Sequence, residues 1–176
     1  MSKKTKTTVT VITAVVLTVS IIFGWFVYSG RAGTTKKNLK TDFASRIQTQ
    51  EELKVKKSVG SDSAGLLAYN QNKDKISFGL YKENAIGRYA YVGGGNISLN
   101  DGEIKKYEIE DCKSAVYVSL NSSKICEIRV YDNILEPEII RINPDRPFVL
   151  AEPKGAENID FINVQGIEVE ATERIY

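Results

Sequence analysis

The stretch from Ser114 to Tyr131 reads SAVYVSLNSSKICEIRVY and contains two runs in which apolar and polar residues alternate. The runs Ser114 to Leu120 and Ile125 to Tyr131 are rich in β-branched and aromatic residues, and the polar segment Asn121 to Lys124 separates them. Alternation with a period of two is typical of β-strands. We therefore expect two consecutive strands joined by a four-residue turn.

The same pattern continues on both sides, from Ala64 to the end of the chain, with turn residues about every ten positions. The runs expected to be strands are Leu66 to Asn70, Lys75 to Tyr81, Ile86 to Val92, Glu103 to Glu110, Ser114 to Leu120, Ile125 to Tyr131, Pro137 to Ile142, Phe148 to Ala151, Ile159 to Val164 and Ile167 to Glu170. So many strands cannot bury their apolar faces as one flat layer, and no long helical pattern lies between them. The sequence predicts an all-β fold over residues 64–176, an antiparallel β-sandwich of jelly-roll or Ig-like type.

Alternation also predicts which side chains form the core of this sandwich. The expected core residues are Ile76, Phe78, Val116, Val118, Ile128, Val130 and Phe148. If Lys82 to Ala85 is a four-residue turn, Phe78 pairs with Tyr89 and Ile76 pairs with Tyr91. This register places both tyrosines on the core face, beside Phe78.

The N-terminal part of the chain contains a run without charge, Thr7 to Gly30. A helix of this length extends about 36 Å, against a hydrocarbon core of about 30 Å, so the run predicts a transmembrane helix in contact with membrane lipid. The alternatives are a cleaved signal peptide, for which the run is long, and a buried soluble helix, which its apolar circumference disfavours. Long domains cross membranes largely regardless of their charge. We expect residues 1–6 to form a short basic cytoplasmic tail and the C-terminal domain to be extracytoplasmic.

Residues 31–63 are expected to form a basic stem between the membrane and the domain. Leu39, Phe43 and Ile47 recur every four residues, which predicts a short amphipathic helix from about Thr41 to Lys57. The chain as far as the end of this helix holds 11 basic and 3 acidic side chains. That excess suits anionic headgroups or other surface polyanions, although a topology signal followed by a solvated linker explains it equally.

The chain contains no histidine, which excludes Ser/His/Asp and Cys/His catalytic sites and histidine metal sites. It also lacks a Ser-x-x-Lys motif and the glycine motifs that bind phosphates. We therefore expect no catalytic residue, no cofactor, no metal and no nucleic-acid partner. A hydrolase that uses a pair of carboxylates stays as an alternative, with Asp101, Glu103, Asp145 and Glu152 as the positions to test.

The most unusual local feature is Gly93-Gly94-Gly95-Asn96, directly after a predicted strand. Consecutive glycines let a ligand approach the backbone closely, but a wide turn or bulge between strands is the commoner reason for them. Tyr117 alternates with apolar neighbours and is expected to expose its ring. The candidate binding surface therefore consists of Gly93, Gly94, Gly95, Asn96 and Tyr117.

Cys112 and Cys126 are candidate partners in a disulfide, which is common in exported domains. In a simple meander of strands the two residues would lie roughly 20 Å apart, against about 5 to 7 Å between the Cα atoms of a disulfide. Either the strands do not form a simple meander here, or the two thiols stay unpaired.

Together these features predict a single-pass membrane protein with an extracytoplasmic β-sandwich that acts as a non-catalytic binding or assembly module at the cell surface. Another envelope protein or a surface polymer is the expected partner. The alternatives are a module that binds a glycan or small ligand and a carboxylate-based hydrolase. Loss of partner capture after Tyr117→Ala or Gly94→Val would favour a binding module, whereas loss of turnover after replacement of carboxylates would favour an enzyme.

Overall fold

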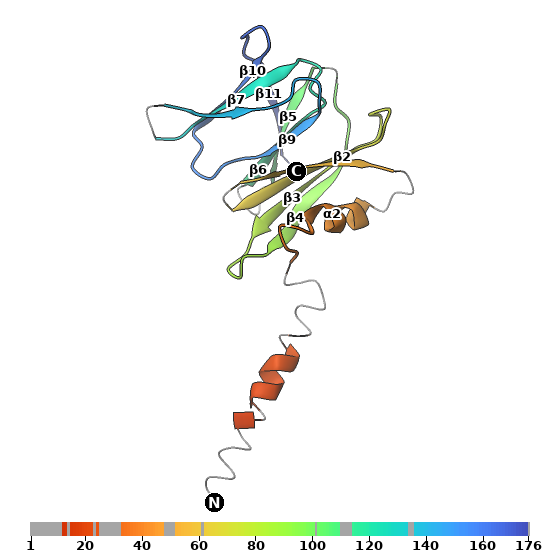
Figure 1. The fold of residues 1–176 in the computed structure, drawn as a ribbon, viewed down its shortest axis with the longest axis vertical. Coiled ribbons are helices and arrows are strands. Elements are labelled where there is room, and N and C mark those ends of the chain that lie inside the picture. Colours follow the sequence, from red (N-terminus) through yellow and green to blue (C-terminus); the bar gives the residue numbers. More distant parts are fainter. Residues whose placement is uncertain are drawn as a thin grey trace, which may run out of the picture.

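The computed structural model describes residues 12–13, 15–22, 24, 33–47, 52–60, 62–100, 102–109, 114–133 and 136–175. Figure 1 shows a layered β domain with one helix, α2, on its lower side. The elements of this domain are α2 (Leu39–Ile47), β1 (Lys54–Val59), β2 (Ser63–Tyr69), β3 (Ile76–Glu83), β4 (Tyr89–Ile97), β5 (Ile104–Ile109), β6 (Ser114–Ser119), β7 (Ile125–Tyr131), β8 (Glu138–Arg141), β9 (Phe148–Ala151), β10 (Asn158–Asn163) and β11 (Ala171–Ile175).

The described strands form three sheets. Sheet A has the order β1-β2-β3-β4, sheet B has the order β11-β5-β6-β9, and sheet C has the order β10-β7-β8. Neighbouring strands are antiparallel except β11, which runs parallel to β5. The predicted all-β fold with antiparallel sheets is confirmed. Sheet A is a meander of consecutive strands, however, and so differs from the Greek-key order of jelly-roll and Ig folds.

The layers follow the order α2, sheet A, sheet B and sheet C. One apolar cluster joins α2 to sheet A, a second lies between sheets A and B, and a third lies between sheets B and C. The residues predicted to form the core are all buried: Ile76, Phe78, Val116, Val118, Ile128, Val130 and Phe148. Because sheets A and B are each covered on both faces, successive residues of β2 and β6 are buried and not only alternate ones.

Most predicted strands are present, and β7 and β9 have the predicted bounds. The prediction of a strand from Ile167 to Glu170 is wrong: the last strand is β11, and Glu168 makes only an isolated bridge to Ile162. Of the alternatives left open for β6 and β7, the simple meander in which they pair is not formed. The turn after β6 carries the chain from sheet B to sheet C, so these two consecutive strands lie in different layers.

The helix α2 packs on the outer face of sheet A and belongs to the folded domain. Leu39 and Phe43 are buried in this contact. Gly79 leaves space for the aromatic ring, since a Cβ at this position would lie 2.5 Å from Cε2 of Phe43. The hydroxyl of Tyr81, at the centre of the sheet, donates a hydrogen bond of 2.7 Å to Oδ2 of Asp42. Apolar packing and this bond together fix the helix on the sheet.

The segment expected to be a stem also supplies a strand of sheet A. The predicted helix from Thr41 to Lys57 is wrong in its second half, because Lys54–Val59 forms β1 and pairs with β2. Val55 and Val59 pack with the apolar cluster beneath α2. The lysines of β1 lie on an edge strand, where charge discourages pairing with a second chain. The folded domain therefore starts before Ala64.

The register of β4 differs from the prediction. Glu83 pairs with Tyr89 and Tyr81 pairs with Tyr91, and the register shifts by one residue further along the strand. Tyr89 is buried as expected, but both tyrosines pack in the cluster beneath α2 and not beside Phe78. The turn is longer than four residues, because the backbone N–H groups of Ile86 and Arg88 both donate hydrogen bonds to Oδ1 of Asn84.

The predicted transmembrane run, Thr7 to Gly30, lies largely outside the described residues, as does the predicted tail at 1–6. The residues that are described between 12 and 24 are helical and exposed. In the part of the chain that the structure describes, no helix is both long enough and apolar enough to cross a bilayer.

Candidate functional site

The glycines of the candidate binding surface lie inside β4 and not in a loop. A Cβ at Gly93 would overlap the side chain of Ile109, and a Cβ at Gly94 would overlap the carbonyl oxygen of Phe78. The glycines therefore allow close packing of β4 against its neighbours. Asn96 accepts a hydrogen bond of 2.7 Å at its Oδ1 from Oγ of Ser77.

A small hollow of about 210 Å³ remains next to these residues, between β4 and the C-terminal part of α2. Gly94, Gly95 and Asn96 line it, together with Arg46 and Tyr91. The guanidinium of Arg46 lies 4.8 Å from the centre of the Tyr91 ring, and its Nε donates to Asp42. Arg46 thus makes its contacts within α2 and with Tyr91, while Ser77 and Asn96 bond to each other between β3 and β4.

Tyr117 does not expose its ring, contrary to the prediction. It is 7% exposed, lies between sheets B and C, and has its ring centre 5.2 Å from that of Phe161. The reason is that sheet C covers the face of sheet B that the alternation assigned to solvent. Tyr117 belongs to sheet B and Gly93 to Gly95 belong to sheet A, so the structure does not bring the two parts of the candidate surface together.

Of the two cysteines, only Cys126 is described. Among the described residues it has no disulfide partner, and its Sγ lies 3.7 Å from the carbonyl oxygen of Ile162. Cys112 lies outside the described residues, so the disulfide between these two positions stays a prediction. The argument against it from a simple meander does not hold, because β6 and β7 lie in different sheets.

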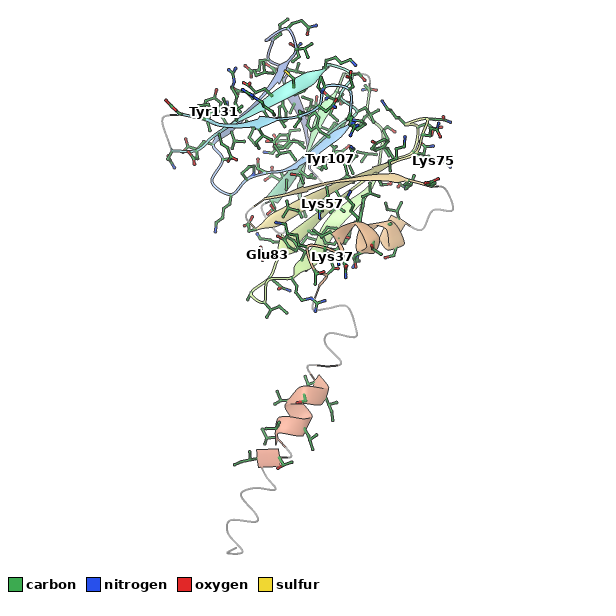
Figure 2. The ribbon with its side chains drawn as sticks, viewed as in Figure 1. Lys37, Lys57, Lys75, Glu83, Tyr107 and Tyr131 are labelled. Atoms are coloured by element: carbon green, nitrogen blue, oxygen red, sulfur yellow. The ribbon has the colours of Figure 1, made fainter. Side chains whose placement is uncertain are left out.

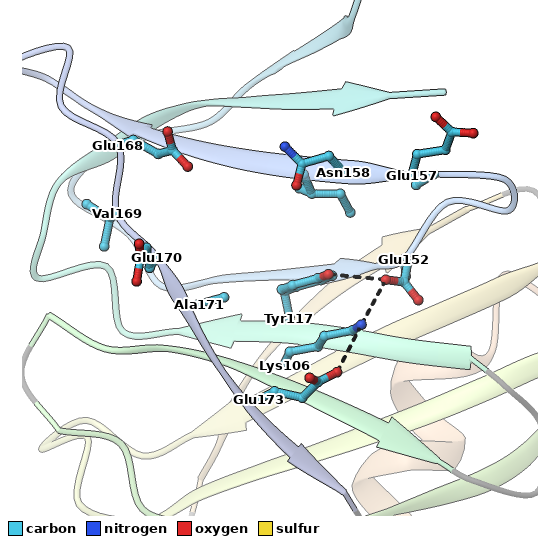
Figure 3. Close-up of a pocket in the computed structure, with 12 residues that line it drawn as sticks. Lys106, Tyr117, Glu152, Glu157, Asn158, Glu168, Val169, Glu170, Ala171 and Glu173 are labelled. Carbon is cyan, nitrogen blue, oxygen red and sulfur yellow. Dashed lines mark hydrogen bonds and ion pairs between the residues drawn. The ribbon is translucent and has the colours of Figure 1, made fainter. Parts of the chain in front are cut away.

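Charged side chains gather around a cavity of about 440 Å³ between sheets B and C, which we call the acidic hollow (Figure 3). It is open to solvent. Five glutamates and one lysine carry the charges of its lining. The polar residues that define the acidic hollow are Lys106, Tyr117, Glu152, Glu157, Asn158, Glu168, Glu170 and Glu173.

The register of sheet B positions the inner residues of the acidic hollow. Lys106 on β5 pairs with Glu173 on β11, and with Tyr117 on β6. Glu152 follows β9, and its backbone N–H donates a hydrogen bond of 2.9 Å to the carbonyl oxygen of Ala115. Strands β5, β6 and β11, with the residue that follows β9, thus bring four side chains together: Lys106, Tyr117, Glu152 and Glu173.

Lys106 is the internal counter-ion of this group. Its Nζ lies 3.2 Å from a carboxylate oxygen of Glu173, 3.5 Å from Glu152 and 4.0 Å from Glu108. Burial acts to lower the pKa of Lys106, but the neighbouring carboxylates outweigh burial and raise it. The hydroxyl of Tyr117 donates a hydrogen bond of 3.1 Å to Oε1 of Glu152, as Figure 3 shows. Burial, with Glu152 next, raises the pKa of Tyr117, so its hydroxyl stays protonated at neutral pH.

The outer glutamates of the acidic hollow have no such partner. Within the described part of the chain, the side chains of Glu157, Glu168 and Glu170 form no ion pair or hydrogen bond. No group of His, Cys, Asp or Glu side chains in that part has the geometry to hold a metal ion. Chemically, the acidic hollow attracts extended cationic groups and repels phosphates and carboxylates.

The sequence singled out two residues of this arrangement, Tyr117 as part of a binding surface and Glu152 as a carboxylate. Glu152 was among the carboxylates considered for a hydrolase, whereas Glu103 pairs with Lys105, Asp145 pairs with Lys124, and Asp101 lies outside the described residues. The signal that could have indicated the rest is the closely spaced set Glu168, Glu170 and Glu173 near the end of the chain. Lys106 carries no such signal, because only tertiary pairing surrounds it with carboxylates.

We expect Lys106→Met to lower the free energy of unfolding at pH 7 by about 1–2 kcal/mol, since it leaves partly buried carboxylates without their cation. Because the pKa of Lys106 is raised in the folded state, its contribution to the free energy of unfolding is fully present below pH 10.5. That contribution disappears as the pH rises through the folded-state pKa. The difference between wild type and variant should therefore shrink above pH 10.5 in urea titrations. Lys124→Met is the control, because Lys124 forms an exposed pair with Asp145, and about 0–1 kcal/mol is expected for it. Equal losses for both variants would contradict the structural role of Lys106.

Comparison of the chain with known proteins gives no further identification. No family model matches it, and neither does any curated protein or solved structure.

Proposed function

We propose that this chain is a single-pass membrane protein whose extracytoplasmic β-sandwich-like domain acts as a non-catalytic binding or assembly module at the cell surface. The N-terminal run anchors it in lipid, and residues 1–6 lie in the cytoplasm. Another envelope protein or a surface polymer is the partner.

The observation that carries the proposal is the short connection between the apolar run and the domain. Thr34 is bridged to Tyr89 by two backbone hydrogen bonds of 2.8 Å, and Gly33 packs against the same backbone. Thr34 is four residues after Gly30, so the chain between them spans at most about 14 Å. A run long enough to cross a bilayer is thus followed almost directly by a folded domain, which suits display at a membrane surface.

The charge of the domain supports a binding role and indicates the chemistry of the partner. Residues of β10 and β11 line part of the acidic hollow, and Figure 1 shows these two strand labels on the side of the domain away from α2. Its outer glutamates favour a partner that presents lysine or arginine side chains. At low ionic strength they also attract such a partner over a longer distance and so speed its association. Among the described residues, the polar contacts of Lys106 hold strands of sheet B together, and those of Asp42 hold α2 on sheet A.

Accessibility on intact cells tests the display of the domain. We expect the full chain to stay in membranes after alkaline extraction and an added protease to cleave the domain without permeabilisation. The physical reason is the apolar run, whose orientation places all later residues outside. Release by alkaline extraction would contradict the anchor, and protection until the cells are permeabilised would contradict the orientation.

Site-specific photo-cross-linking on the same cells tests the binding role. A photoreactive residue at Glu168 should give discrete adducts, and one at exposed Gln71, in the β2–β3 turn, should not. Glu157→Gln combined with Glu170→Gln should reduce the adducts at position 168, as should high salt. No adduct at position 168, or equal adducts at both positions, would contradict a partner at the acidic hollow.

A further inference from the structure

The bridge between Thr34 and Tyr89 determines which part of the domain lies nearest to the apolar run. The bridge is antiparallel and isolated, and the chain turns at residues 36–38 directly after it, close to the start of β4. The segment that holds Lys36 and Lys37 is therefore next to the β3–β4 turn, which holds Ile86 and Arg88. Figure 1 shows this turn at the lower end of the domain, opposite the β10–β11 turn.

The side chains at this end have the character of a lipid-facing surface. Lys36 and Lys37 are exposed, and Ile86 is 54% exposed at the turn, where no core requires an isoleucine. We call Lys36, Lys37, Ile86 and Arg88 the membrane-proximal face. Figure 2 places Lys37 and Glu83 at this same lower end of the domain. Glu83 adds one negative charge beside three positive ones, and its carboxylate accepts a hydrogen bond of 3.4 Å from Tyr89.

Arg88 supplies an independent observation that indicates an anion. Its Nε is buried and has no hydrogen-bond partner among the residues that the structure describes. A guanidinium that is partly removed from water without an acceptor for its Nε is unfavourable, and an anion that meets the outer nitrogens of the same group offsets part of this cost. The backbone N–H of the same residue is already bonded to Oδ1 of Asn84, so the turn holds Arg88 in place.

We propose that the membrane-proximal face rests on the anionic headgroups of the bilayer that holds the N-terminal run, with Arg88 and the two lysines on lipid phosphates and Ile86 in the interface. This inference depends on the proposed anchor. The connection of at most about 14 Å from Gly30 to Thr34 keeps the face within reach of the headgroups. The acidic hollow is repelled by the same lipids, which favours an orientation that keeps its outer glutamates away from the bilayer.

Hydrogen–deuterium exchange of the full chain in lipid nanodiscs tests the contact. One nanodisc contains only zwitterionic phosphatidylcholine, and the other contains phosphatidylglycerol in addition. We expect the peptide that covers residues 82–90 to exchange several-fold more slowly in the anionic nanodisc, because headgroups cover the turn. The β10–β11 turn, around exposed Ile167, should exchange equally in both.

Matched variants separate lipid contact from a change in the fold. Lys36→Glu combined with Lys37→Glu should abolish the difference between the two lipids, whereas Lys73→Glu combined with Lys154→Glu, the same charge change at exposed turns elsewhere, should preserve it. Ile86→Asp should speed exchange of the turn in the anionic nanodisc, and Ile167→Asp should not. Equal exchange of residues 82–90 in the two nanodiscs, with the chain inserted, would overturn this inference and leave the anchor standing. A chain that does not enter nanodiscs would overturn both.

Discussion

We expect Gly94→Ala to lower the free energy of unfolding of the full chain by about 2–5 kcal/mol. Gly94 has φ +148, a backbone conformation that residues with a Cβ rarely adopt. Its added methyl group would also meet the carbonyl oxygen of Phe78 and the Cα of Gly79 on β3, which are backbone atoms at the centre of sheet A. The strand would have to move, so hydrogen bonds between β3 and β4 would be lost. Urea denaturation in detergent, followed by far-UV circular dichroism, measures the loss.

Gly155→Ala is the matched control for this change. Gly155 has φ +84, but nothing lies within 4 Å of an added Cβ, so only the backbone strain remains and about 1 kcal/mol is expected. A ligand-loop role for Gly94 would instead leave the melt of Gly94→Ala unchanged and weaken partner capture. Equal losses for the two variants would show that packing of β4 against β3 does not select glycine.

Phe43→Ala is expected to lower the free energy of unfolding by about 3–5 kcal/mol, since it removes a fully buried ring and leaves a cavity. Phe43 is 2% exposed and fills the space above Gly79 on sheet A. A stem helix outside the domain would tolerate this change without loss. The substitution therefore tests whether α2 is a layer of the fold, by the same urea denaturation.

Ala44→Ser, at an exposed position of the same helix, is the control and should change stability by less than about 0.5 kcal/mol. A second measurement locates the effect. In Phe43→Ala, exchange of backbone amides should increase in β1 and β2 beneath α2, and not in sheet C. Wild-type stability of Phe43→Ala would place α2 outside the cooperative unit and support a separate stem.

The local pattern of the sequence was sufficient to predict most of the strands and part of the core. Period-two alternation predicted β7 and β9 with their bounds, and it predicted burial of Phe78, Val116 and Val118. This succeeds because alternation reports which side of a strand is apolar, a property of neighbouring residues alone. The apolar run at Thr7 to Gly30 is an equally local signal, and it supports the proposed anchor.

Only the tertiary structure decided which layer covers each face of a strand, and this determined the candidate site. Tyr117 is buried because sheet C covers the outer face of sheet B, and Lys106 meets Glu173 because β11 adds to β5 in parallel. The Lys54–Val59 segment, with its lysines, is a strand because β2 offers an open edge to it. The residues and strands that contact one another in these three cases are far apart in the chain. Which of them meet depends on how the layers stack. A period of two in one segment carries no information about that choice.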